Sequence, residues 1–146
     1  MIADWLNTPA AQLNTNAQNA AETRQGMLTK PPGALGKLES VAIKLAAMQG
    51  VEKPTMDKIH ISVFAGDHGV AAQGVSAFPQ AVTTEMVKNF ASGGAAISVM
   101  AKSLGATLEV INLGTVNDPG SLPIVLDQRI APSTADFTTD AAMSEE

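Results

Sequence analysis

An Asp-His-Gly triplet at residues 67 to 69 could do chemistry, because it follows an apolar segment and holds one of the chain's two histidines. A carboxylate beside an imidazole can orient the ring for acid–base work or help to bind a metal ion. Metal sites of useful affinity need three or more ligands, however, and the other histidine, His60, lies inside the apolar segment. No serine occupies a nucleophile-elbow motif. The structural alternative is that Asp67 closes a loop by accepting backbone N–H bonds while His68 packs beneath it.

Two further groups of residues could bind small molecules. Phe78, Pro79 and Met86 place an aromatic ring and a thioether near the start of an expected helix. They could form a slot for a flat aromatic ligand, or they could be core residues. Gly93 and Gly94 could cradle an anion at a helix start, but they match no nucleotide-binding fingerprint, and adjacent glycines also mark tight helix–helix turns.

The elements that must position these residues follow an α/β pattern. Residues 59–65 are rich in β-branched and aromatic side chains, which favours a strand. Pro79 suits the first turn of a helix that carries apolar residues at 82, 86 and 90 and ends near 92–94.

A second helix and a second strand are expected next. Ser92 can cap this helix, and Gly105 supplies the left-handed residue that ends it. Its expected buried stripe consists of Ile97, Met100, Ala101 and Leu104. Residues 106–115 form a nearly continuous apolar run, which favours a buried strand, and 121–131 can add a short third one.

A strand, two helices and a strand predict a right-handed crossover with parallel strands. Asp67 and Gly114 then lie at the same carboxyl edge of the sheet. Open α/β sheets bind ligands beyond that edge, so the loops after both strands are expected to face a ligand.

The N-terminal part reads as two helices. The first is expected from about Pro9 to Gly26, and the second follows a Pro-Pro-Gly turn and runs to Gly50. Leu35, Leu38, Ala42 and Leu45 make the second helix's apolar stripe, whereas Lys37, Glu39 and Lys44 are expected on a solvated outer face.

Composition excludes several classes of function. The formal charge of −5 and the lack of a Lys/Arg cluster argue against a nucleic-acid partner. The absence of cysteine excludes disulfides, thiolate zinc sites and a cysteine nucleophile, and suits a reducing cytosol. No signal peptide and no membrane-spanning run is visible, so a cytoplasmic protein without a membrane partner is expected.

The expected sheet is incomplete. Two good strands and one doubtful one cannot cover their own edges, so the chain is expected to continue beyond Glu146 or to complete its sheet by dimerising. Residues 138–146 look like the start of a helix, which favours continuation.

Four motifs together resemble the nicotinate-nucleotide–dimethylbenzimidazole phosphoribosyltransferase family, which makes the lower-ligand nucleotide of cobalamin. They are LTKPPGALGKLE, FAGDHGV, GVSAFPQAVTTEMVKNFASGGAAISVMA and INLGTV, and RIAPSTADFT looks like their continuation. The resemblance implies a Rossmann-like α/β domain, a small helical domain and a homodimer. Residues 1–52 would then be the N-terminal helices of the small domain, and 53–146 the first part of the large one.

The resemblance also implies a reaction. The family moves the ribose phosphate of nicotinate mononucleotide to 5,6-dimethylbenzimidazole, releases nicotinate and gives α-ribazole 5'-phosphate, without a metal or organic cofactor. The substrate-binding residues that it implies are Asp67, His68, Gly69, Phe78, Pro79 and Met86. Some relatives carry a small hydroxyl residue in place of Phe78 and Gln in place of Met86, which suggests that this sequence favours a differently substituted base.

No catalytic residue is expected in this chain. The family's general-base glutamate lies in a Gly-rich motif near its C-terminus, and neither Glu145 nor Glu146 matches it. We therefore expect an enzyme portion that is inactive alone. The alternatives are a truncated, non-catalytic module that binds an aromatic ligand or another subunit, and, more weakly, a metal-dependent hydrolase built on Asp67 and His68.

Overall fold

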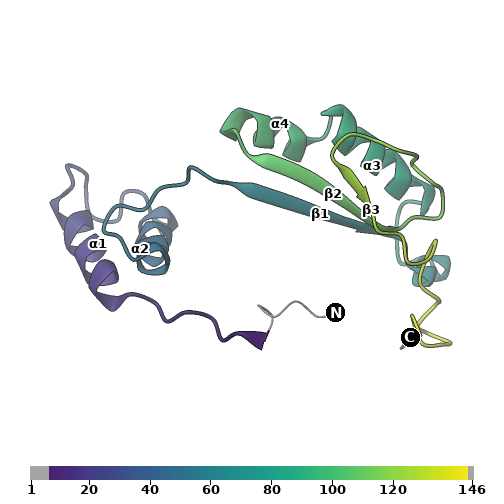
Figure 1. The fold of residues 1–146 in the computed structure, drawn as a ribbon, viewed down its shortest axis with the longest axis horizontal. Coiled ribbons are helices and arrows are strands. Elements are labelled where there is room, and N and C mark those ends of the chain that lie inside the picture. Colours follow the sequence, from purple (N-terminus) through teal and green to yellow (C-terminus); the bar gives the residue numbers. More distant parts are fainter. Residues whose placement is uncertain (1–6, 145–146) are drawn as a thin grey trace. The chain divides into compact units, whose positions relative to one another are not determined.

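The computed structural model describes residues 7–144, and the chain divides into two compact units, Met1–Asp57 and Lys58–Glu146. Figure 1 shows the elements of each unit. This boundary, like the one expected after residue 52, falls in the segment between the second helix and the first strand.

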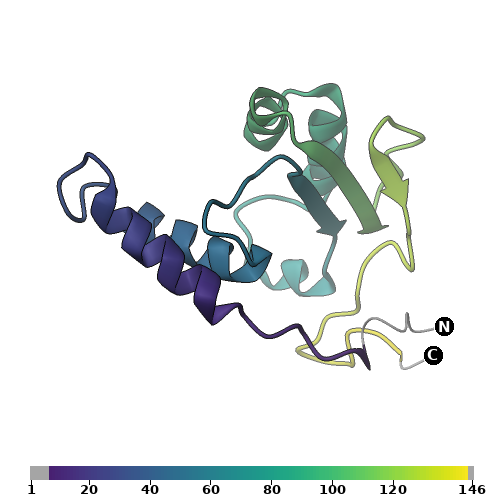
Figure 2. The ribbon, with the colours of Figure 1, turned by 60° about the vertical axis from the view of Figure 1, so that its left-hand side comes forward.

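The first unit is a pair of helices lying side by side, α1 (Thr15–Met27) and α2 (Lys37–Gln49), as Figure 2 shows. α1 begins at Thr15 and not near Pro9, because the Asn14 side chain accepts a hydrogen bond from the Ala17 N–H at 2.9 Å and so caps the first turn. The buried residues are small, which lets the two helices approach closely: Ala17, Ala21, Ala46 and Ala47.

The expected apolar stripe of α2 is only partly right. Leu35 precedes the helix, and Leu38 is 67% exposed. Glu39 is half-buried, although we expected it in solvent; its Oε1 accepts from Lys30 Nζ at 2.7 Å and from the Leu35 N–H at 3.1 Å. The hydrogen bond from Lys30 is the main cause that holds the pKa of Glu39 below its usual value. Gly50, in the left-handed region, ends the helix as expected.

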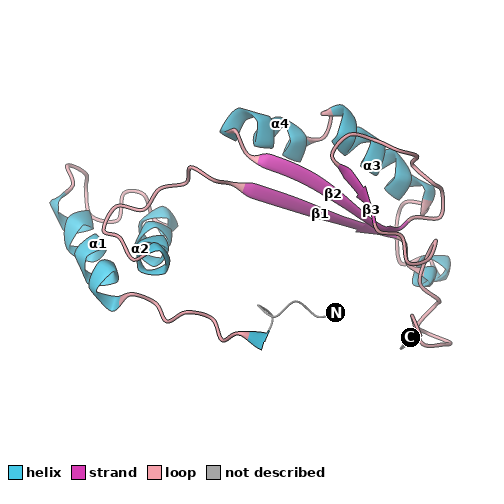
Figure 3. Ribbon diagram, viewed as in Figure 1, coloured by secondary structure: helices cyan, strands magenta, loops and turns pink. Residues whose placement is uncertain are grey.

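The second unit is built on a parallel sheet in the order β1-β2-β3, which confirms the expected α/β fold (Figure 3). The strands are β1 (His60–Gly66), β2 (Thr107–Gly114) and the short β3 (Val125–Asp127). Val63 pairs with Val110, and Val110 with Val125, so these three side chains share one face. An irregularity in the pairing falls between Ala65 and Gly66, at the carboxyl end of β1.

Two helices, α3 (Ala81–Ser92) and α4 (Ala96–Leu104), lie along one face of this sheet (Figure 1). Beneath them is an apolar core in which Ala65, Val87 and Val110 are buried and Phe90 is partly buried. Phe64 lies on the other face of the sheet, where its side chain is 65% exposed.

The expected stripe of α4 is wrong at two positions. Met100 and Leu104 are exposed, whereas Ser98 and Ala101 are buried. The fully buried positions of this helix are thus held by small residues, and of the predicted large ones Ile97 is half-buried. Gly105 ends it as expected.

The turn between α3 and α4 explains the paired glycines. Ser92 is the last residue of α3 and not a cap for α4, because Gly93, in the left-handed region, ends α3 by donating its N–H to the carbonyls of Asn89 and Phe90. A Cβ on Gly94 would collide with the Asn89 side chain. The pair therefore forms a tight helix–helix turn.

No helix begins in residues 138–144, contrary to our expectation. The Asp136 carboxylate accepts hydrogen bonds from both the N–H and the hydroxyl of Thr138, and the Thr139 N–H bonds to the Asp136 carbonyl. The Asp140 N–H also bonds to the Asp136 carbonyl at 3.0 Å, so residues 136–140 form one capped turn. The chain then folds back, and the Ala135 N–H donates to the Ala142 carbonyl at 2.9 Å, so the turn does not continue as a helix.

Candidate functional site

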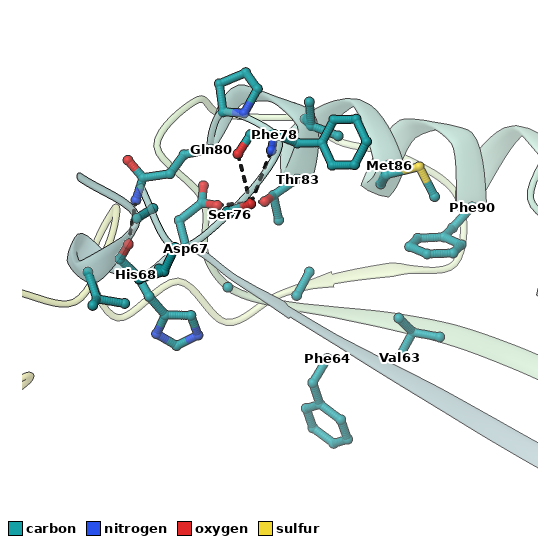
Figure 4. Close-up of a pocket in the computed structure, with 17 residues that line it drawn as sticks. Val63, Phe64, Asp67, His68, Ser76, Phe78, Gln80, Thr83, Met86 and Phe90 are labelled. Atoms are coloured by element: carbon teal, nitrogen blue, oxygen red, sulfur yellow. Dashed lines mark hydrogen bonds between the residues drawn. The ribbon is translucent and has the colours of Figure 1, made fainter. Parts of the chain in front are cut away.

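A cavity of about 530 Å³ opens at the carboxyl end of β1, where open α/β sheets bind ligands (Figure 4). Its walls come from the end of β1, from the short 3-10 helix η2 (Gly69–Gln73), from the loop before α3 and from α3 as far as Phe90. A second cavity, of about 440 Å³, lies at the ends of β1 and β2 beside residues 130–144.

Phe78, Pro79 and Met86 all line the first cavity. Phe78 is 70% exposed and Met86 is 38% exposed, so neither is a core side chain. The hydroxyl of Ser76 holds the loop in shape, because it accepts from the Phe78 N–H at 3.2 Å and donates to the Phe78 carbonyl at 3.0 Å. The ring of Phe78 and the thioether of Met86 therefore lie on one wall of the cavity, a pair of groups that can contact a flat apolar ring.

Asp67 is buried, with 5% of its surface exposed, and both of its carboxylate oxygens are in use. Oδ1 accepts from the Thr83 hydroxyl at 2.6 Å, and Oδ2 accepts from the Val116 N–H at 2.8 Å. The carboxylate thus joins the end of β1 to α3 and to the loop after β2. The sequence had offered a purely structural role for Asp67, in which it accepts backbone N–H bonds and closes a loop. The structure shows such a bond from Val116, and adds a bond from the Thr83 side chain on a helix.

His68 is exposed and does not pack beneath the loop. Figure 4 shows its ring on the same side of the β1 end as the ring of Phe64, whereas Phe78 and Met86 lie on the other side. His68 and Phe64 border both cavities. Since both oxygens of Asp67 bond elsewhere, the structure does not bring Asp67 and His68 together as an acid–base pair.

Gly69 lies where the chain passes close to itself. Its N–H donates to the Thr134 carbonyl at 3.0 Å, next to an isolated bridge between His68 and Thr134. A Cβ at this position would lie 2.6 Å from the backbone of Ala135 and Asp136. Only glycine fits here without a backbone shift.

Gln80 and Thr83 are among the residues of the cavity wall that sequence reasoning missed. The Gln80 amide nitrogen donates to the His68 carbonyl at 3.0 Å and to the Ser133 hydroxyl at 3.2 Å, which links the α3 start to two other segments. Thr83 lies four residues after Pro79 and three before Met86. Helical spacing places it on their side of α3, and this signal could have identified it.

The chemistry of the first cavity is that of an apolar slot. Its lining includes no lysine and no arginine, and its Asp67 carboxylate is occupied, so it suits a neutral heterocycle better than an anion. Across residues 7–144, no three His, Asp or Glu side chains gather to hold a metal ion. Within the same range, no helix has the length and apolar character to cross a membrane.

A family model described as phosphoribosyltransferase matches residues 10–146. The chain is 56% identical over 144 residues to a nicotinate-nucleotide–dimethylbenzimidazole phosphoribosyltransferase from Xanthomonas euvesicatoria pv. vesicatoria (strain 85-10). It is 50% identical over 145 residues to a protein of the same name from Pseudomonas putida (strain W619). These alignments cover 99% of this chain but 41% of each relative's length.

Two solved structures also align with most of this chain. The crystal structure of CobT from Thermus thermophilus aligns with a TM-score of 0.78 and 43% identity over 88% of this chain and 39% of that one. A crystal structure of the nicotinate-nucleotide–dimethylbenzimidazole phosphoribosyltransferase from the same organism gives a TM-score of 0.80 at 42% identity, over 90% and 40% of the two chains.

Proposed function

Since the chain belongs to the nicotinate-nucleotide–dimethylbenzimidazole phosphoribosyltransferase family, we propose that it forms the aromatic-base pocket of an enzyme that transfers ribose phosphate to a benzimidazole. The donor would be nicotinate mononucleotide, and the products α-ribazole 5'-phosphate and nicotinate. The observation that carries this proposal is the apolar cavity beyond β1, walled by Phe78, Pro79 and Met86.

The proposed reaction is a displacement at C1 of the ribose. A ring nitrogen of the benzimidazole forms the new bond to C1 as the bond from C1 to the nicotinate nitrogen breaks, and the nicotinate ring nitrogen leaves neutral. The azole N–H proton passes to a general base, which must lie within hydrogen-bonding distance. The leaving group departs readily, so much of the catalysis consists of placing the two rings.

The described residues fit the placing part of this task. Phe78 and Met86 would contact the faces and edge of the heterocycle, and Pro79 would fix the turn that presents them. Asp67, His68 and Gly69 would shape the edge of the same crevice. The glutamate base that the resemblance implies lies in a motif absent from this sequence, so the proposed role of this chain is binding and orientation.

A calorimetric titration with 5,6-dimethylbenzimidazole tests the proposal. We expect the chain to bind the base, and Phe78→Ala to weaken binding by ~1–3 kcal/mol through lost apolar contact. Phe137→Ala is the matched control, since Phe137 is 61% exposed and does not line the cavity. Equal affinities for wild type and Phe78→Ala would mean that the base does not bind in this cavity.

A homodimer and a cytoplasmic location belong to the same proposal. The homodimer is what the resemblance implies for the longer enzyme, and the location is what a cysteine-free sequence suits. Light scattering on a full-length relative beside this chain would measure the first.

A further inference from the structure

We infer that Asp67 and Thr83 form a positioning pair, which holds the start of α3 at the carboxyl end of β1 and thereby sets the shape of the first cavity. The inference rests on the proposed function for its ligand, a benzimidazole, but its structural part can be measured without one. In this role Asp67 acts on the base through Thr83 and does not contact it.

The carboxylate of Asp67 has a rigid foundation. The Asp67 N–H donates to the Gly114 carbonyl at 2.7 Å, and the Asp67 carbonyl accepts from the Thr134 N–H at 3.1 Å. With Oδ2 bonded to the Val116 N–H, three bonds fix the residue to the neighbouring strand end and loops. Oδ1 therefore stands at a defined point, facing α3.

Thr83 transmits this position to the cavity wall. Its hydroxyl donates to Oδ1 at 2.6 Å, within the range of short hydroxyl–carboxylate bonds. The Thr83 N–H also bonds to the Gln80 carbonyl in the first turn of the helix. Because Met86 lies one turn further along the same rigid helix, a shift of Thr83 moves Met86 as well.

Thr84 supplies a matched comparison within the same helix. Its hydroxyl likewise donates to a loop, to the Asn117 carbonyl at 2.9 Å, and the residue is 1% exposed. Unlike Thr83, it does not line the cavity. Both threonines thus anchor α3 to segments outside the helix, but only Thr83 does so at the ligand's position.

The test compares Thr83→Val, Thr83→Ser and Thr84→Val in this chain. The affinities for 5,6-dimethylbenzimidazole and for unsubstituted benzimidazole are measured by calorimetry, and the Met86 methyl signal is recorded by NMR without ligand. We expect Thr83→Val to shift the Met86 signal, to weaken dimethylbenzimidazole binding about tenfold and to change the ratio of the two affinities. Thr83→Ser, which keeps the hydroxyl, is expected to restore all three values. Thr84→Val is expected to lower the melting temperature while leaving all three near wild type.

Two results would overturn the inference: equal effects of Thr83→Val and Thr84→Val on affinity, or an unmoved Met86 signal in Thr83→Val. If wild type binds neither base, the proposed function fails, and the Met86 signal still decides whether the pair positions the helix. Should Thr83→Val not fold, Asp67→Asn replaces it and is expected to shift the same signal.

Discussion

Gly69 lies against the backbone of residues 134–136, which leaves no room for a side chain. In Gly69→Ala the new methyl group would lie 2.6 Å from the backbone of Ala135 and Asp136, so the crossing segment must move. We expect the free energy of unfolding to fall by ~1–3 kcal/mol and the residue-69 amide to exchange its hydrogen faster. Chemical denaturation and hydrogen exchange measure the two effects.

The control is Gly26→Ala. Gly26 lies in α1 and needs no left-handed backbone, and a methyl group added there would meet no atom within 4 Å. Alanine should therefore leave stability unchanged or slightly raised. Equal stabilities for wild type and Gly69→Ala would mean that the crossing segment yields at no cost.

For individual residues, the sequence predicted the positions of the candidate site residues along the fold better than their hydrogen-bond partners. Asp67 was expected at a strand end because a β-branched run precedes it, and the structure places it there. Its bond to Thr83 could not be predicted, because it depends on how far α3 lies from β1. The close approach at Gly69 joins residues 65 positions apart and leaves no local signal.

Between elements, Glu109 on β2 ties the first two strands together and should make their stability depend on pH. Its Oε1 receives His60 Nε2 at 2.9 Å and the Ser62 hydroxyl at 2.7 Å, both from β1. The bond to His60 is the main cause that holds the pKa of Glu109 below its usual value of 4.5. A carboxyl group with a lowered pKa stabilises the fold fully above its usual pKa, and this contribution disappears as the pH falls through the lowered value.

We therefore expect Glu109→Gln to melt below wild type at pH 6, and this difference in melting temperature to shrink as the pH falls below 4.5. Ser62→Ala removes only the second donor, so its melting temperature at pH 6 should lie between those of wild type and Glu109→Gln. Melting curves followed by circular dichroism at several pH values check this. A difference that stays constant over the whole range would assign the effect to packing and not to the charge.

The helices show why element positions were easier to predict than buried faces. Proline and glycine punctuation marked the end of α2 and the turn after α3. The buried face is chosen jointly with the neighbour, however. α1 offers small alanines, so α2 buries Ala46 and Ala47 and leaves Leu38 exposed, although the apolar pattern of α2 alone favours leucine.

For the whole molecule, we expect this chain alone to form no measurable α-ribazole 5'-phosphate. The one carboxylate at the first cavity, Asp67, has both oxygens bonded, and the expected glutamate base is not in this sequence. General-base catalysis commonly contributes about 100- to 10,000-fold, so the rate should fall below a full-length relative's by at least about 100-fold. Chromatography of the products, with such a relative assayed in parallel, measures this.

The outcome also separates the enzyme from the non-catalytic module. Turnover at a rate comparable with the relative's would refute the expectation and require a proton acceptor among the residues of this chain. Absent turnover combined with base binding fits the proposed role. Binding of other aromatic ligands in place of benzimidazoles would favour the module.

The segment that crosses Gly69 also sets an order of events during translation. β1 leaves the ribosome long before Ser133 and Thr134, which brace its carboxyl end through Gln80, Gly69 and Asp67. A nascent chain that stops short of residue 134 therefore lacks the backbone bonds that Thr134 makes with Asp67 and Gly69, so we expect it to bind a heterocycle more weakly than a chain from which these residues have emerged.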